Sequence, residues 1–353
     1  PRLRPLALLG ALALACGPTS GTSEGESEGT TTGTDTTTEG GSASASSTGA
    51  DLPTPHGWQV SAHLDTDIGS IFSIWGDGPE TIMAVGGQPT AGVILEYVDG
   101  AWVPDPGIPP STPRLNWIHG IGEDRVAVGY YGAVIHRVGG VWEPRESNAG
   151  APLWGAWGAT AHALWAVGGA GMELPPVMIH FDGEAWTPVD VSAVSGESHA
   201  LYKIWGRAAD DIYAIGSLGL ILHYDGDTWS SEETPTTSTL IGIHGDDDEV
   251  IVAGGRASGV VLRRQEGVWN ALAFPDDQGF DGAWIDPAGY ATVVGRRGFI
   301  ALFAPESSAW VREESGVEEE LHSVFGIPGG PVFAVGGFFD KAPYTGVILE
   351  RLP

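Results

Sequence analysis

Residues 201–229 read LYKIWGRAADDIYAIGSLGLILHYDGDTW and form the clearest copy of a unit that recurs along the chain. In this copy an apolar run ends in Trp-Gly, an acidic turn follows, and a second apolar run ends at Gly216. A short turn, an alternating run and an Asp-Gly turn then lead to Trp229. Short apolar runs separated by such turns predict the β-strands of an all-β protein.

The unit recurs about every 40 residues, which is the spacing of blades in β-propellers. The glycine that ends the second strand occurs seven times, at Gly86, Gly129, Gly168, Gly216, Gly254, Gly295 and Gly336. The tryptophan of the fourth strand also occurs seven times, at Trp58, Trp102, Trp142, Trp186, Trp229, Trp269 and Trp310. Two series of seven predict seven four-stranded antiparallel blades.

The two series are offset against each other. Trp58 precedes the first glycine, whereas the last copy ends in VILERLP at residues 347–353 without a tryptophan strand. Residues 57–64 are therefore expected to complete the last blade. A ring closed by strands from both ends of the domain leaves no open sheet edge. We predict that residues 56–353 form one seven-bladed β-propeller.

Several elements of the unit resemble known repeats. The order of AVGG at residues 84–87, Tyr97, and Trp102 five positions later resembles kelch-type propellers. A closer resemblance is to bacterial repeats built on Trp-Gly, Asp-Ile-Tyr-Ala-Val-Gly and His-Tyr-Asp-Gly-x-x-Trp, which occur in secreted and lipid-anchored proteins. The resemblance spans nearly all of residues 57–353. It implies a propeller fold and no particular activity.

The tryptophan of the Trp-Gly element is replaced in some copies. Trp75, Trp157, Trp205 and Trp284 correspond to His119, His244 and Phe325 in the other three copies. Because several flat side chains occupy this position, we expect it to pack between blades.

The first residues predict export and lipidation. Residues 1–16 read PRLRPLALLGALALAC, in which two arginines precede a short apolar run, as in a signal peptide. The final Ala-Leu-Ala-Cys resembles the lipobox of bacterial lipoproteins, which implies that Cys16 is lipidated. Gly17 after the cysteine is typical of sorting to the outer membrane, on either its periplasmic or its cell-surface side. The alternative is an ordinary secretory leader with a chance cysteine.

Residues 17–55 are almost wholly Thr, Ser, Gly and Glu. Such a segment buries too little apolar surface to offset its ordering entropy, so we expect a disordered tether. The formal net charge of −29 disfavours nucleic acid and acidic membrane surfaces as partners. Membrane contact is expected only through the lipid anchor, and the propeller is expected to be monomeric. Because Cys16 is the only cysteine, no disulfide can form within the chain.

Candidate metal and catalytic residues are few. His136, His180 and His223 share one third-strand position, but equivalent positions in neighbouring blades lie about 10 Å apart, too far for one metal ion. The acidic run at residues 246–249 lacks the pattern of a calcium loop, and a solvated turn is favoured. The expected propeller, residues 56–353, contains no Gly-x-Ser-x-Gly elbow and no phosphate loop. The sequence predicts no catalytic residue, metal or cofactor.

The connections between second and third strands are expected to open on one face of the ring, together with the segments between blades. Loops of this kind usually carry function. Basic and aromatic residues gather there and would surround a positive depression: Arg256, Arg296, Arg297, Lys341, Tyr130, Tyr131, Phe338, Phe339 and Tyr344. Charge-assisted contacts and stacking at this loop face would bind an anionic glycan or an acidic protein segment. Scattered solvated loops are the alternative.

The sequence thus favours a cell-envelope binding scaffold for a protein or glycan ligand. A polysaccharide-active hydrolase or lyase is the second hypothesis, and a purely structural envelope component is the third. Two carboxylates within about 5 to 10 Å of each other beside the basic loops would favour the hydrolase.

Overall fold

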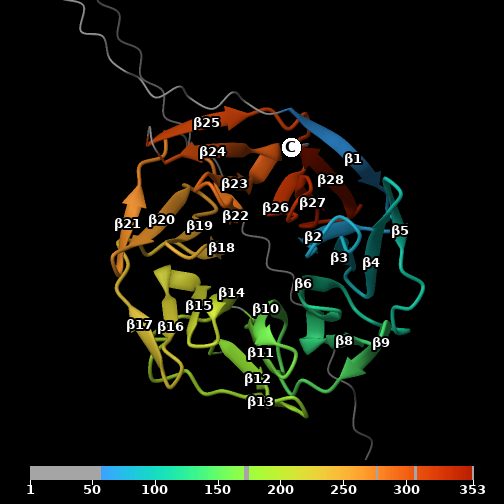
Figure 1. Ribbon diagram of the computed structural model, residues 1–353, viewed down its shortest axis with the longest axis horizontal. Coiled ribbons are helices and arrows are strands. Elements are labelled where there is room, and N and C mark those ends of the chain that lie inside the picture. Colours follow the sequence, from blue (N-terminus) through green and yellow to red (C-terminus); the bar gives the residue numbers. More distant parts are fainter. Residues whose placement is uncertain (1–56, 171–174, 276, 306–307, 352–353) are drawn as a thin grey trace, which may run out of the picture. The chain divides into compact units, whose positions relative to one another are not determined.

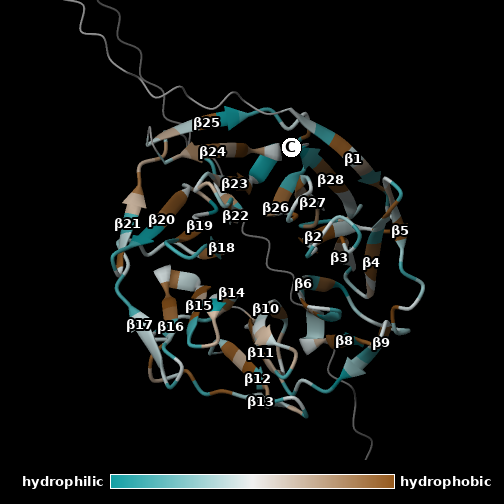
Figure 2. Ribbon diagram, in the orientation of Figure 1, coloured by the Kyte–Doolittle hydropathy of each residue, from teal (hydrophilic) through white to brown (hydrophobic). Residues whose placement is uncertain are grey.

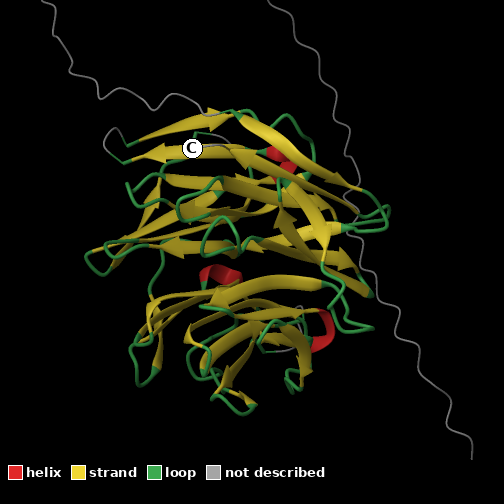
Figure 3. Ribbon diagram, turned by 45° about the vertical axis from the view of Figure 1, so that its right-hand side comes forward, coloured by secondary structure: helices red, strands yellow, loops and turns green. Residues whose placement is uncertain are grey.

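The repeated apolar runs form β-strands in the structure, a computed structural model that describes residues 57–170, 175–275, 277–305 and 308–351. These residues form seven four-stranded antiparallel sheets around a common centre (Figure 1). The only helices described are short 3-10 turns, η1 (Tyr130–Gly132), η2 (Ser217–Gly219) and η3 (Arg296–Gly298) (Figure 3). The predicted seven-bladed β-propeller is therefore confirmed. The predicted signal peptide, the lipidated Cys16 and the tether of residues 17–55 lie outside the described residues.

Six of the blades each take four strands in chain order, from the centre outward (Figure 1). The first three blades are β2 (Ser70–Trp75), β3 (Met83–Gln88), β4 (Ala91–Val98) and β5 (Ala101–Pro104); β6 (Leu115–Ile121), β7 (Asp124–Gly129), β8 (Val134–Val138) and β9 (Val141–Arg145); and β10 (Leu153–Thr160), β11 (Ala163–Gly168), β12 (Val177–Phe181) and β13 (Trp186–Pro188). The next three are β14 (Leu201–Ala208), β15 (Asp211–Gly216), β16 (Ile221–Tyr224) and β17 (Trp229–Glu232); β18 (Leu240–Gly245), β19 (Val250–Gly254), β20 (Val260–Gln265) and β21 (Val268–Leu272); and β22 (Phe280–Ile285), β23 (Ala291–Gly295), β24 (Ile300–Ala304) and β25 (Ala309–Glu313).

The seventh blade is built from both ends of the domain. It contains β26 (Glu320–Gly326), β27 (Val332–Phe338) and β28 (Thr345–Arg351), and its outermost strand is β1 (Trp58–Leu64). β1 pairs antiparallel with β28, with Trp58 opposite Arg351 and Leu64 opposite Gly346 (Figure 1). The predicted closure of the ring by the first strand is correct.

The hydrophobic core lies mainly between neighbouring blades. Val128 of the second blade packs in one buried cluster with Leu153 and Ile179 of the third. Hydrophobic residues are concentrated along middle strands such as β12 and β20, whereas the connections around the rim are largely hydrophilic (Figure 2). This arrangement explains why the middle strands read as continuous apolar runs in the sequence.

The repeated Trp-Gly element joins successive blades. A Cβ added to Gly206 would lie 2.6 Å from Cη2 of Trp157, so the missing side chain makes room for the indole of the preceding blade. Gly120, Gly245 and Gly326 receive Trp75, Trp205 and Trp284 in the same way. In the copies with histidine, His119 hydrogen-bonds to the carbonyl of Gly158 at 3.1 Å. The structure therefore places these flat side chains between blades.

The repeated tryptophan of the outer strand also contacts the preceding blade. Six of the seven indole nitrogens donate a hydrogen bond to that blade: Trp58 to Glu313, Trp102 to Ser61, Trp142 to Asp105, Trp186 to His136, Trp269 to Glu232 and Trp310 to the carbonyl of Ala273. The indole nitrogen of Trp229 has no partner among the described residues, and this ring packs edge-on against Trp165.

Candidate functional site

The seven inner strands, β2, β6, β10, β14, β18, β22 and β26, surround the centre of the propeller (Figure 1). Each of them has a β-bulge at the same place, where one residue is skipped in the pairing with the second strand. We call the skipped residues the bulge ring: Phe72, Asn116, Trp154, Tyr202, Ile241, Asp281 and His322. Bulges redirect side chains and are common beside functional sites.

The bulge ring is chemically diverse although its neighbours are repetitive. The residue before each bulge is always a large, wholly buried apolar residue: Ile71, Leu115, Leu153, Leu201, Leu240, Phe280 or Leu321. The bulge residues include an acid, an amide, a histidine and three other aromatic side chains. The repeated residues build the blade, whereas the bulge ring differs from blade to blade, and two of its members, Asp281 and His322, line a cavity at the centre of the propeller.

A cavity of about 230 Å³ lies in the central channel, lined by residues of all seven inner strands. Its charged or titratable lining includes Lys203, Asp281 and His322, and its aromatic lining includes Trp117 and Trp205. Neither the ionisable side chains nor the enclosed space is needed to pair the strands.

Lys203 is buried with only 4% of its surface exposed. Its ammonium donates a hydrogen bond of 3.0 Å to the carbonyl of Trp154 and lies 4.6 Å from the centre of the Trp117 ring. Burial lowers the pKa of Lys203 to about 7, and the nearby charge of Asp281 partly opposes that change.

Asp281 is buried beside a second carboxyl group, that of Glu320. Burial, the charge of Glu320 and a hydrogen bond to it together raise the pKa of Asp281 to about 8, against the opposing charges of Arg256 and Arg296. Glu320 accepts a hydrogen bond of 3.1 Å from Arg256, and Nε of Arg296 lies 4.0 Å from its other oxygen. Asp281 therefore holds a proton more readily than an exposed carboxyl group does, and Glu320 pairs with the arginines.

Arg114, just before β6, is a further buried charged residue, close enough to His322 to influence its pKa. Only 4% of its surface is exposed. Its guanidinium lies between two aromatic rings, 4.3 Å from the centre of Phe72 and 3.8 Å from the centre of Tyr130. Nε has no hydrogen-bond partner among the described residues, and burial lowers the pKa of the group. A buried guanidinium that lacks a carboxylate is costly in free energy.

Five of the predicted loop-face residues line one depression of about 590 Å³: Arg296, Arg297, Phe338, Phe339 and Lys341. Glu318, Glu320 and Asp340 line it as well. Arg297 lies 3.8 Å from Glu318, and Arg256 joins the group through Glu320. The depression is therefore less positive than the sequence led us to expect, because acidic residues lie beside its arginines.

The predicted tyrosines gather around Arg114 instead. Tyr130 covers its guanidinium, and the ring centre of Tyr131 lies 6.0 Å from that of Tyr130, with 75% of Tyr131 exposed. The phenol of Tyr344 is close enough to influence the pKa of Arg114. Phe339 links the two groups, because its ring centre is 5.2 Å from that of Phe72.

Sequence reasoning missed the buried or partly buried members of the site: Arg114, Lys203, Asp281, Glu320 and His322. A signal was present, since LYKIW at residues 201–205 and FDGAW at 280–284 place a charged residue inside an apolar strand. In the other copies these two neighbouring positions hold side chains without formal charge.

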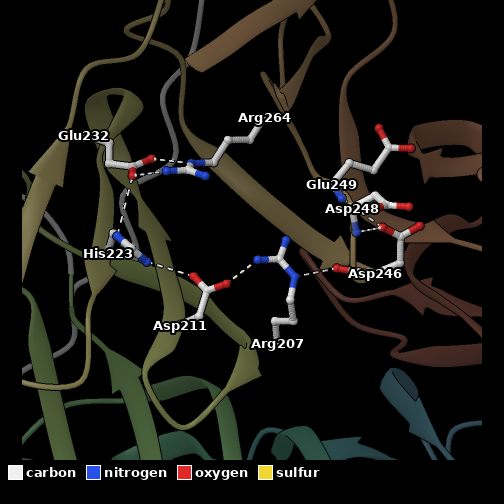
Figure 4. Close-up of polar contacts among 8 residues, drawn as sticks. All are labelled: Arg207, Asp211, His223, Glu232, Asp246, Asp248, Glu249 and Arg264. Carbon is white, nitrogen blue, oxygen red and sulfur yellow. Dashed lines mark hydrogen bonds and ion pairs between the residues drawn. The ribbon is translucent and has the colours of Figure 1, made fainter. Parts of the chain in front are cut away.

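The histidines of the third strands have separate partners. His136 accepts a hydrogen bond of 3.1 Å from the indole of Trp186, and His180 packs on Trp165. His223 lies between Asp211, at 2.8 Å, and Glu232, at 3.6 Å (Figure 4). Within the described ranges, no three His, Cys, Asp or Glu residues are grouped to hold a metal ion.

The acidic run at residues 246–249 forms a turn (Figure 4). Oδ1 of Asp246 accepts hydrogen bonds from the backbone amides of Asp248, at 2.9 Å, and Glu249, at 2.8 Å. The carbonyl of Asp246 also accepts a 2.7 Å hydrogen bond from Arg207 of the preceding blade. Through these contacts the acidic run links the fourth and fifth blades.

No family model matches the chain. The immune protein Tsi7 from Pseudomonas aeruginosa is 33% identical over 118 residues, which are 32% of this chain and 38% of the length of Tsi7. The chain thus spans well under half of this curated relative.

Among solved structures, YCF48 from Cyanidioschyzon merolae has a TM-score of 0.66 at 12% identity, covering 84% of this chain and 99% of its own. The WD40 propeller of Doa1 has a TM-score of 0.63 at 10% identity, covering 83% and 97%. U3-55K has a TM-score of 0.62 at 10% identity, covering 85% and 100%. These similarities show the propeller fold.

Proposed function

We propose that this chain is a cell-envelope binding scaffold whose loop face receives an acidic segment of another protein. The observation that carries the proposal is the distribution of positive charge. Six of the 16 Lys and Arg residues of a chain with net charge −29 belong to this face and the channel beneath it: Arg114, Lys203, Arg256, Arg296, Arg297 and Lys341. Glu318, Glu320 and Asp340 offset part of this charge, and the excess that remains would attract acidic partners.

Exposed aromatic side chains on the same face support a protein partner. Tyr131 is 75% exposed and Phe338 is 49% exposed. Large aromatic residues of this kind are the usual anchors of protein interfaces, where a few of them contribute most of the binding energy. An anionic glycan is the competing ligand, because it would use the same charges.

The matched stretch of Tsi7 supports a second, more specific role. Tsi7 is described as an immune protein, and the 33% identity extends over about a third of this chain. We propose that an immune role would be exerted through the same loop face. The predicted lipidation at Cys16 and the tether that follows would hold that face near a membrane.

Hydrolase chemistry is less well supported. Glycoside hydrolysis needs two carboxyl groups about 5 to 9.5 Å apart, with room for the glycosidic bond or a water molecule. Asp281 and Glu320 instead share a hydrogen bond, and Asp281 is 3% exposed. Two carboxyl groups in such close contact leave no space between them for a substrate.

The test is a titration with two synthetic peptides, acetyl-hexaglutamate amide and acetyl-hexaglutamine amide, followed by calorimetry in low and physiological salt. We expect salt-sensitive binding of the glutamate peptide only. The double variant Arg296→Glu, Arg297→Glu should weaken it at least tenfold. The control, Arg137→Glu with Arg145→Glu in the outer strands β8 and β9, makes the same change in net charge and should bind like the wild type.

Equal weakening by both double variants would mean that overall charge, and not the loop face, governs binding. Absence of binding to the wild type would exclude an acidic segment as the ligand. If a uronate oligosaccharide bound and the glutamate peptide did not, the ligand of the loop face would be a glycan.

A further inference from the structure

We infer that Arg114 is the receptor for one carboxylate of the acidic segment, an inference that rests on the proposed function. Only 4% of the residue is exposed, and its guanidinium forms no ion pair with a described carboxylate. Most buried charges in proteins have a partner of opposite charge, because desolvation is otherwise uncompensated. The missing partner is best supplied by a ligand.

The two aromatic rings determine how an anion can approach. Phe72 and Tyr130 cover the faces of the guanidinium, at 4.3 and 3.8 Å from its central carbon. A planar guanidinium with covered faces presents only its edge, where two N–H groups match the two oxygens of a carboxylate. Of its three nitrogens, only Nε is both wholly buried and unbonded, so its terminal amino groups keep contact with the outside.

The neighbouring charges favour the same ligand. Arg114, Lys203 and Arg256 all act electrostatically on His322, which lies among them. Arg256 is paired with Glu320, whereas Arg114 and Lys203 have no carboxylate within salt-bridge distance among the described residues. Arg114 therefore remains a positive charge without a counter-charge at this end of the channel, and a carboxylate bound to it would supply that counter-charge.

The stability of Arg114 variants separates a binding role from a structural one. If Arg114 serves a ligand, its burial destabilises the free protein, and Arg114→Met should keep or raise the melting temperature. If Arg114 serves the fold, the same change should lower it. Arg114→Lys keeps the charge but loses the two-pronged geometry.

The experiment titrates the full chain and these variants with acetyl-hexaglutamate amide, with Arg137→Met as the control, and records the melting temperature of each. We expect Arg114→Met to weaken binding at least tenfold without a lower melting temperature, and Arg114→Lys to weaken it less. The control should bind like the wild type.

Unchanged affinity in Arg114→Met, with the peptide still lost in the Arg296→Glu, Arg297→Glu variant, would overturn the role of Arg114 and leave the proposed function standing. A lower melting temperature together with unchanged affinity would assign Arg114 to the fold. No binding by the wild type would overturn both proposals.

Discussion

The indole nitrogen of Trp58 donates a buried hydrogen bond of 2.7 Å to Oε2 of Glu313. The two residues belong to the first strand of the domain and to the outer strand of the sixth blade. Glu313 also accepts a hydrogen bond from Arg351, at 3.3 Å, which lies opposite Trp58 in the pairing of β1 with β28. One carboxylate thus contacts both the first and the last strand of the propeller at the closure of the ring.

Replacing Trp58 by Leu should therefore be costly. The change removes a buried aromatic ring and one donor to a buried carboxylate, and should lower the free energy of unfolding by about 3 to 5 kcal/mol in urea denaturation. Trp310→Leu is the matched control, because its indole bonds to a backbone carbonyl and is only partly buried. Similar losses for the two variants would show that closure is no more critical than any other blade contact.

Gly206→Ala should destabilise the protein by about 1 to 3 kcal/mol, since the new methyl group would lie against Trp157. Gly78→Ala provides the control, because nothing lies within 4 Å of its added Cβ. Denaturation curves of both variants measure the difference. A neutral Gly206→Ala would mean that the indole moves aside without cost.

Acid should weaken the packing of His119 and His244 between blades. Burial lowers the pKa of His119 and of His244 to about 4. Because these folded-state values lie below the ordinary value of 6.5, the stability that the neutral rings provide is complete above pH 6.5 and is lost as the pH falls towards 4. The loss should be measurable, because a tenfold change in the proton affinity of one ring corresponds to about 1.4 kcal/mol.

The double variant His119→Phe, His244→Phe should lose less stability between pH 6.5 and 4 than the wild type. Phenylalanine is suitable because Phe325 occupies the same position in the seventh blade. Melting temperatures across this range test the prediction, with exposed His63→Gln as the control. Parallel curves for the wild type and the double variant would exclude these two rings as the acid-sensitive groups.

Lys203→Met should change the alkaline stability profile. Burial holds the pKa of Lys203 at about 7 in the folded protein, against 10.5 for the free side chain. Between these values the unfolded chain binds the extra proton, so wild-type stability gains from this group as the pH rises. The Met variant lacks this gain, and its advantage over the wild type should shrink between pH 8.5 and 10.

The pH range above 8.5 is chosen because Asp281 changes the stability of the protein in the opposite direction, and does so mainly below this range. Its pKa of about 8 is raised from 3.8, so the stability it provides in its protonated form is lost as the pH rises through that value. Lys341→Met at the loop face is the control. A constant difference between Lys203→Met and the wild type would contradict a buried, neutralised lysine.

The fold was predictable because its signals repeat. The offset between the glycine and tryptophan series located the closing strand at residues 57–64, and the structure pairs Trp58 to Leu64 with β28. The substitutions of His and Phe for Trp could be interpreted for the same reason, because a position that holds only flat rings indicates packing between blades. A residue that recurs in every blade indicates a contact that every blade requires.

The site was predictable only in part, because it depends on features that do not repeat. A bulge adds one residue to a strand, and the sequence of β22 does not show that Asp281 is the residue skipped. The burial of Arg114 depends on Phe72 and Tyr130, which belong to different blades. The acidic partners of the predicted arginines, Glu318 and Glu320, lie in and before β26 and were likewise not apparent.

The pairing of β1 with β28 also orders events during synthesis. β1 is made first among the strands, and its partner is the last. At a ribosomal rate of about 5 to 20 residues per second, β1 waits roughly 15 to 60 s before its partner exists. During that interval the backbone donors and acceptors of β1 can pair with the edge of any other strand. The strand that later closes the ring is therefore the one most exposed to mispairing in newly made chains.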